Sequence, residues 1–357
     1  MWPDMSDPDV LERRTDKMRG LTLGLAVGDA IGNQSPPNGV LQSGVATQLA
    51  CFTIEGLIRA SMRMSHKGIC HTPSVIWHAY CRWATVQQIT PRPFEQWTSG
   101  AAKWPDGWLS QVPALSQRRG NTPATVHAIR GARQGSPDHP ATNSPGCQGL
   151  IRTLPLGVVA DDGKQQWAAE LARDTAALTH GHPSALAAAA AGAVIIGHCL
   201  SGDDTRRSLE SGMAEAKAYL AASPEAMSLP KAMNAGFQTP RQLERLRQLA
   251  PASTATAAMR GGLYVAASFP EPEDVGAALA FAALAPHGKS VAAVAGALLG
   301  AVHGVSALPV DLVSRLELAW VVDTLARDVV IELTDSPGGS EYTPPRDPTW
   351  WDRYPGW

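Results

Sequence analysis

Two short segments carry side chains of the kinds that bind phosphate or carboxylate groups. The glycine-rich segment Gly146–Gly149 is followed by Arg152, whose planar guanidinium can donate two hydrogen bonds to one anion. Further along, His180 and His182 flank a glycine just before an alanine-rich stretch. The unbonded N–H groups and the dipole at the start of a helix favour an anion there. Both segments are therefore candidates for contact with a ligand.

Each of these residues also has a purely structural interpretation. An arginine at the start of a buried helix often only satisfies neighbouring carbonyls, and a histidine there often caps or packs. As zinc ligands, His180 and His182 lack a third partner in view. No histidine near Cys147 in the sequence stands at a spacing that indicates a Cys–His pair, so we expect an inert thiol.

Two carboxylates are the candidates for general acid–base chemistry. Asp29 lies in a mostly apolar helical segment, where a lone carboxylate is usually a buried hydrogen-bond acceptor. If the protein catalyses hydrolysis, Asp29 or Glu55 would be the base that activates water. No aspartate or glutamate lies between these two residues, and none lies between Asp274 and Asp311.

Composition narrows the classes of protein. Thirty basic residues against thirty-two acidic ones give a net charge of −2, with no lysine- or arginine-rich run, which makes nucleic acid a poor partner. The five cysteines form no C-x-x-C pair, and no secretion signal is visible, so we expect a cytoplasmic protein. The most apolar window, 185–200, is shorter than the roughly 20 residues that span a bilayer, and we interpret it as a core helix.

Helices must position these side chains. Most of the chain is rich in alanine and leucine with apolar residues at helical spacing, as in 50–58 and 292–302, and no sustained strand pattern appears. Small residues on several helices favour close approach, so we expect an all-α, single compact bundle over 1–335. The proline-rich tail 336–357 is expected to be irregular and to dock on that domain through Trp350, Trp351 and Trp357.

Several of these segments, in this order, resemble the ADP-ribosylglycohydrolase family. The stretch 19–32, with its Gly-Asp-Ala at 28–30, is similar to the opening helix of that family, and Gly120-Asn121-Thr122 to a family turn. The stretch 146–157 resembles the loop and helix start beside ADP-ribose, although Ile151 replaces the usual methionine. The stretch 177–183 resembles the start of the histidine-bearing helix, and 291–304 the last Gly-Ala helix.

The resemblance covers about Met18 to Pro309 and implies both a fold and an activity. The implied fold is an orthogonal helical bundle with a cleft for ADP-ribose or an ADP-ribosylated group. The implied reaction is hydrolysis of an N- or O-glycosidic bond, assisted by two magnesium ions. Family carboxylates hold those ions from a Thr-Asp-Asp-Thr stretch after the first helix and an Asp-Ser-Asp-Thr stretch before the last one.

The carboxylates of both stretches are missing from this sequence. Gly44-Val45-Ala46-Thr47 stands at the first place, and His287-Gly288-Lys289-Ser290 at the second, so His287 and Lys289 align with carboxylates. Magnesium demands oxygen ligands, and an ammonium repels a dication but attracts a phosphate. We therefore predict no metal and no cofactor. The less specific alternative is a decayed protein in which these positions have drifted.

Three hypotheses follow. The first is a pseudoenzyme that binds ADP-ribose or a related nucleotide without magnesium. The second is a metal-independent glycoside hydrolase that uses Asp29 or Glu55. The third is a protein-interaction module that meets a partner through its Trp-rich tail or helical surface. The expected ligand contacts are Thr47, Gly146, Cys147, Gln148, Gly149, Arg152, His180, His182, His287, Lys289 and Ser290.

Overall fold

The computed structural model describes residues 8–31, 39–92, 104–131 and 133–355. Within these ranges the regular structure is helical, and only two isolated bridges, Leu41 with Leu316 and Gly146 with Thr254, pair extended backbone. The prediction of an all-α fold is confirmed. The α-helices are α1 (Pro8–Ile31), α2 (Val45–Lys67), α3 (Thr72–Val86), α5 (Pro123–Ile129), α6 (Gln148–Ile151), α7 (Gln165–Ala177), α8 (Pro183–Ser201), α9 (Thr205–Leu220), α10 (Leu229–Gln238), α11 (Leu243–Leu249), α12 (Ala255–Ser268), α13 (Val275–Ala282), α14 (Gly288–His303), α15 (Val310–Val313), α16 (Ala319–Asp335) and α17 (Trp350–Arg353).

Short 3-10 helices connect several of these elements. They are η1 (Trp108–Gln111), η2 (Pro113–Ser116), η3 (Leu154–Gly163), η4 (Ala226–Ser228), η5 (Pro272–Asp274) and η6 (Val305–Ala307).

The closest helix pair in the bundle is α1 with α14. Gly20, Gly24 and Gly28 lie one turn apart on α1, and each meets the backbone of α14 so closely that an added Cβ would collide with a carbonyl oxygen. The opposing positions on α14 run in reverse order, Gly300, Gly296 and Ala292, so the two helices are antiparallel. This register places the end of α1, with Asp29, beside the start of α14, with Lys289.

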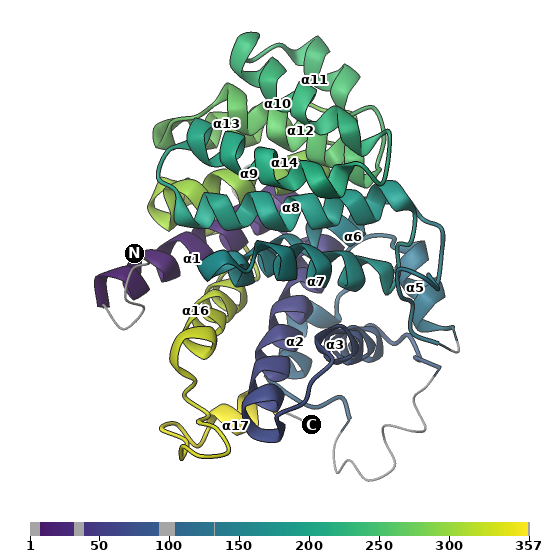
Figure 1. Ribbon diagram of the computed structural model, residues 1–357, viewed down its shortest axis with the longest axis vertical. Helices are drawn as coiled ribbons and strands as arrows, with labels where there is room; N and C mark the ends of the chain where they lie inside the picture. The colour runs from purple at the N-terminus through teal and green to yellow at the C-terminus, as the bar shows by residue number, and fades with distance from the viewer. Residues whose placement is uncertain (1–7, 32–38, 93–103, 132, 356–357) are drawn as a thin grey trace.

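Helix α8 lies at the centre of the bundle, between α7 and α9 (Figure 1). It is the helix found, among the described residues, to be long and apolar enough to cross a membrane. However, 78% of its most apolar window is buried inside the protein, where Ala and Gly allow neighbours to pack closely. This packing agrees with the core helix predicted for 185–200.

The C-terminal tail lies against α2 and α16 (Figure 1). Trp350 is buried and its indole N–H donates to Glu332 at 3.0 Å, while the Tyr354 hydroxyl donates to Asp328 at 2.5 Å. The indole of Trp351 meets the ring of His66 edge to face, at 4.5 Å between centroids. Trp357 lies outside the described residues.

Candidate functional site

A cavity of about 420 Å³ opens where the end of α1 meets the starts of α2 and α14. We call it the cleft. Its walls also include the turn 119–121 and two residues of α6, Gln148 and Ile151. The lining residues are Asp29, Gly44, Val45, Ala46, Arg119, Gly120, Asn121, Gln148, Ile151, Ser253, Ala283, Ala285, Pro286, His287, Gly288, Lys289 and Ser290.

Asp29 provides the carboxylate of the cleft. Its side chain is 6% exposed, and Oδ2 accepts hydrogen bonds from the backbone N–H of Thr47 at 3.0 Å and from the Thr47 hydroxyl at 2.8 Å. Gly44 approaches so closely that a Cβ there would lie 2.5 Å from Oδ1. Burial raises the pKa of the Asp29 carboxyl, and the hydrogen bonds from Thr47 and the charge of Lys289 oppose that rise.

All four positions that the family resemblance would align with carboxylates line this one cavity; they are Val45, Ala46, His287 and Lys289. Two magnesium ions need several carboxylate oxygens, whereas the lining offers Asp29, which already accepts two bonds from Thr47. No group of three or more His, Cys, Asp or Glu side chains in the described ranges could hold a metal ion. The residues present do not fit a binuclear magnesium site.

The rim of the cleft is basic and polar. Arg119 lines it and pairs with Glu317, with 2.9 Å between Nη2 and Oε2. Gln148 also lines the cleft, and its buried Oε1 has no hydrogen-bond partner in the described part of the chain. A buried amide oxygen without a donor is costly, so a ligand N–H or O–H would be well placed there.

Cys147 lies behind the lining. Its Sγ is 3.1 Å from the hydroxyl of Ser290 and 3.4 Å from that of Ser253, and its N–H donates to the carbonyl of Ser253. Burial raises the pKa of this thiol, which keeps it protonated and unreactive at neutral pH. Cys147 thus ties the glycine-rich loop to α14, and neither it nor its neighbours Gly146 and Gly149 lines the cleft.

Arg152 is fully buried away from the cleft. Its guanidinium lies over the ring of Tyr80 at 4.3 Å and donates to the Thr179 hydroxyl at 2.6 Å and the Thr175 carbonyl at 3.3 Å. Burial lowers its pKa. Of the two interpretations open at the sequence level, the geometry matches the structural one, in which the arginine satisfies neighbouring groups.

The two histidines before α8 also act on the protein itself. His180 is buried, with Nδ1 2.7 Å from the Thr179 hydroxyl, and burial lowers its pKa to about 3. It packs directly under the glycine-rich loop, where a Cβ on Gly149 would lie 2.9 Å from the Cβ of His180. His182 caps α8, because its Nδ1 accepts from the N–H of Ser184 at 3.2 Å. Neither histidine lines the cleft.

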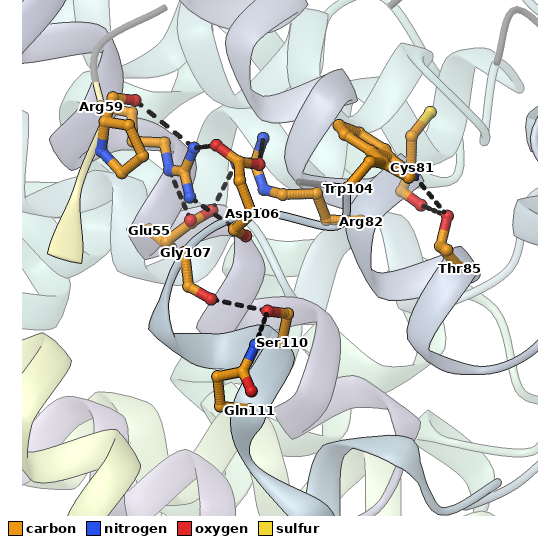
Figure 2. Close-up of polar contacts among 11 residues, drawn as sticks. Glu55, Arg59, Cys81, Arg82, Thr85, Trp104, Asp106, Gly107, Ser110 and Gln111 are labelled. Carbon is orange, nitrogen blue, oxygen red and sulfur yellow. Dashed lines mark hydrogen bonds and ion pairs between the residues drawn. The ribbon is translucent and has the colours of Figure 1, made fainter. Parts of the chain in front are cut away.

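Glu55 lies in a separate buried charge cluster (Figure 2). Its two oxygens are 2.5 Å from Nε of Arg59 and 2.7 Å from Nη2 of Arg82, and Asp106 pairs with both arginines. Both oxygens of Glu55 are therefore engaged by guanidinium groups of the protein itself. The structure does not bring Glu55 to the cleft, so of the two predicted carboxylates Asp29 alone lines it.

Sequence reasoning missed Arg119, Asn121 and Ser253. The Gly120-Asn121-Thr122 turn was noticed only as a family resemblance, and the arginine before it carried no separate signal. Ser253 reaches the site because the backbone near it pairs with the glycine-rich loop, through the Gly146–Thr254 bridge. That pairing joins segments too far apart in sequence for any spacing rule to reveal it.

Comparison with known proteins agrees with this fold. The ADP-ribosylglycohydrolase family model matches residues 11–338, so the chain belongs to the ADP-ribosylglycohydrolase family. It is also similar in fold to a solved structure titled ADP-ribosylglycohydrolase-related protein complex, at TM-score 0.56 and 21% identity, over 90% of this chain and 99% of that chain. No curated protein sequence matches the chain.

Proposed function

We propose that this protein binds ADP-ribose or a related nucleotide in the cleft and does not hydrolyse it with binuclear magnesium. One observation carries the proposal. All four positions that align with metal-binding carboxylates face the same cavity, and they hold Val45, Ala46, His287 and Lys289. The family frame has kept its ligand cavity while the oxygen ligands for a dication are gone.

Electrostatics favour an anionic ligand in that place. Lys289 and Arg119 line the cleft together with the first turn of α14, whose N–H groups carry partial positive charge. Asp29 is the opposing carboxylate, and the bonds from Thr47 occupy one of its oxygens. A phosphate of the ligand is thus attracted to the region where the family would place magnesium.

Calorimetric titration with ADP-ribose tests this proposal. We expect the same Kd in magnesium and in EDTA, because no step of binding uses the metal. Lys289→Gln should weaken binding by about ten- to a hundredfold, the usual worth of a hydrogen bond to a charged group. Lys231→Gln, on the exposed surface of α10, is the matched control and should leave Kd unchanged. Binding that requires magnesium, or turnover of an ADP-ribosylated substrate with magnesium, would refute the proposal.

A gain-of-function variant tests the same idea from the other side. Val45→Asp, Ala46→Asp, His287→Asp and Lys289→Asp together would place four carboxylates around the cavity that holds Asp29. We expect this variant to bind Mn²⁺ or Mg²⁺ in calorimetry while the wild type does not. Equal affinity of the two proteins for the ion would contradict the proposal.

A metal-independent hydrolase is the second candidate function, and the position of Asp29 in the cleft favours it. Burial raises the pKa of its carboxyl, as a general base working near neutral pH requires. This hypothesis expects release of ADP-ribose from an ADP-ribosylated protein in EDTA, and its loss in Asp29→Asn, whose amide oxygen can still accept from Thr47. No release in EDTA would end this hypothesis. The hypothesis of a protein-interaction module would be supported by a cleft that the protein's own side chains fill. The cleft is instead a cavity of about 420 Å³, which gives that hypothesis no support.

A further inference from the structure

A second, smaller cavity adjoins the cleft. It measures about 170 Å³ and shares Val45, Arg119, Gly120 and Asn121 with the lining of the cleft. The turn 119–121 is therefore the common wall of the two spaces. We call the smaller one the annex. A ligand that extends past this turn would occupy both.

The lining of the annex is basic. It contains three arginines, Arg118, Arg119 and Arg130, and no aspartate or glutamate. Arg119 is paired with Glu317, but no carboxylate pairs with Arg118 or Arg130 in the portion of the chain that the structure describes. Arg118 donates through Nε and Nη2 to the carbonyl of Gln87, at 3.3 and 3.2 Å, which orients its guanidinium, and no carboxylate among the described residues balances its charge.

Apolar side chains complete the annex, with Trp83 and Ile89 buried and Val126 half-buried. Trp83, Ile89 and Val126 line it, and the indole of Trp83 is fixed by a hydrogen bond from Nε1 to Gln48 Oε1 at 3.2 Å. Arg118 and Arg130 are exposed at its mouth. Apolar side chains lower the local dielectric constant. A guanidinium beside them therefore attracts an anion more strongly than it would in open water. The arrangement suits a compact anionic group attached to a larger ligand.

We propose that the annex binds a second phosphate of the ligand held in the cleft, so that the preferred ligand is an ADP-ribose-like nucleotide with an additional phosphate monoester. This inference rests on the proposed function. A phosphate monoester carries close to two negative charges at neutral pH and offers three acceptor oxygens. Arg118 and Arg130 supply the matching donors, and Arg119 lies between the two anionic groups.

Calorimetry with two nucleotides tests the inference on the full chain. ADP-ribose 2′-phosphate should bind about ten- to a hundredfold more tightly than ADP-ribose, because it adds hydrogen bonds to a charged group. The double variant Arg118→Gln, Arg130→Gln should lose that difference while its Kd for ADP-ribose stays unchanged. Arg207→Gln, an exposed arginine on α9, is the matched control. Equal Kd values for the two nucleotides on the wild type would overturn the inference and leave the proposed function standing.

A second measurement judges the annex without any nucleotide. Phenylglyoxal modifies accessible arginines, and peptide mass spectrometry reads each one separately. Inorganic pyrophosphate should protect Arg118 and Arg130 from modification but not Arg207. If neither nucleotide binds, the proposed function fails, and protection of these two arginines would still show an anion site in the annex. Equal modification of all three arginines with and without pyrophosphate would overturn the annex site as well.

Discussion

Replacing Glu332 by glutamine should stabilise the protein above neutral pH and have little effect in acid. Glu332 lies on α16 beneath the C-terminal tail and is 3% exposed. Its Oε2 accepts from the Ser336 hydroxyl at 2.7 Å and from the Trp350 indole at 3.0 Å. Burial raises the pKa of this carboxyl from 4.5 to about 7, although the hydrogen bonds from Ser336, Ser61 and Trp350 act against the rise.

The size and sign of the effect follow from that pKa. Raising a pKa from 4.5 to about 7 is a shift of about 2.5 units, which corresponds to about 3 kcal/mol of folding free energy. The folded state holds the proton more tightly than the unfolded chain. The contribution is therefore complete below pH 4.5, declines as the pH rises, and is lost above pH 7. Glutamine does not ionise, so the variant escapes this loss.

Urea unfolding followed by tryptophan fluorescence, at pH 4.5 and at pH 8, measures the difference between the two proteins. We expect nearly equal free energies of unfolding at pH 4.5 and an advantage of up to about 3 kcal/mol for Glu332→Gln at pH 8. Glu341→Gln, at an exposed residue of the tail, controls for the removal of one charge. A difference between wild type and Glu332→Gln that does not change with pH would refute the reasoning.

Three further variants or reagents test other parts of the structure. Gly24→Ala should cost about 1–3 kcal/mol in thermal unfolding, because the added methyl would collide with the Gly296 carbonyl, and wild-type stability would contradict that contact. Tyr354→Phe removes a hydroxyl donor from Asp328 and should cost about 1–3 kcal/mol in urea unfolding, whereas an unchanged midpoint would mean that the tail is not held there. Cys147 should react with a disulfide reagent at neutral pH only after unfolding, and rapid labelling of the folded protein would show that its thiol is not buried.

The fold was readable from the sequence because its determinants are local. Alanine, leucine and glycine at helical spacing predict helices that pack closely, and the small residues of α1 and α14 show this most directly. Small residues along these two segments are visible without a structure. What the spacing does not reveal is which helix faces which, and the antiparallel register that sets Asp29 beside Lys289 comes only from the three-dimensional contacts.

The site was predictable in part. Four of the residues expected to contact a ligand line the cleft, namely Gln148, His287, Lys289 and Ser290, and their contact with a ligand stays a prediction. Arg152 was not predictable in the same way, since a guanidinium serves an anion or its own neighbours equally well. Its orientation depends on Tyr80 on α3 and on Thr179 in the turn after α7, and both are distant from it in sequence.

The same limitation applies to Glu55. Arg59, one turn further along α2, is a partner that the i,i+4 spacing allows, but the second guanidinium comes from Arg82 on α3, and Asp106 joins the cluster by pairing with both arginines. Arg119 shows the converse case: no motif marks it in the sequence, and only the folded turn brings it to the wall of two cavities.

The glycine contact between α1 and α14 has a consequence for how the protein can change its ligand. Because the two backbones are in direct contact, neither helix can slide along the other or rotate against it without a steric clash with a carbonyl group at each turn. The α1–α14 contact beside Asp29 is thus rigid, and a new ligand specificity has to arise from changes in the segments around the cleft. Substitutions in the arginine-bearing turn at 118–121 would disturb the packing of the helices least.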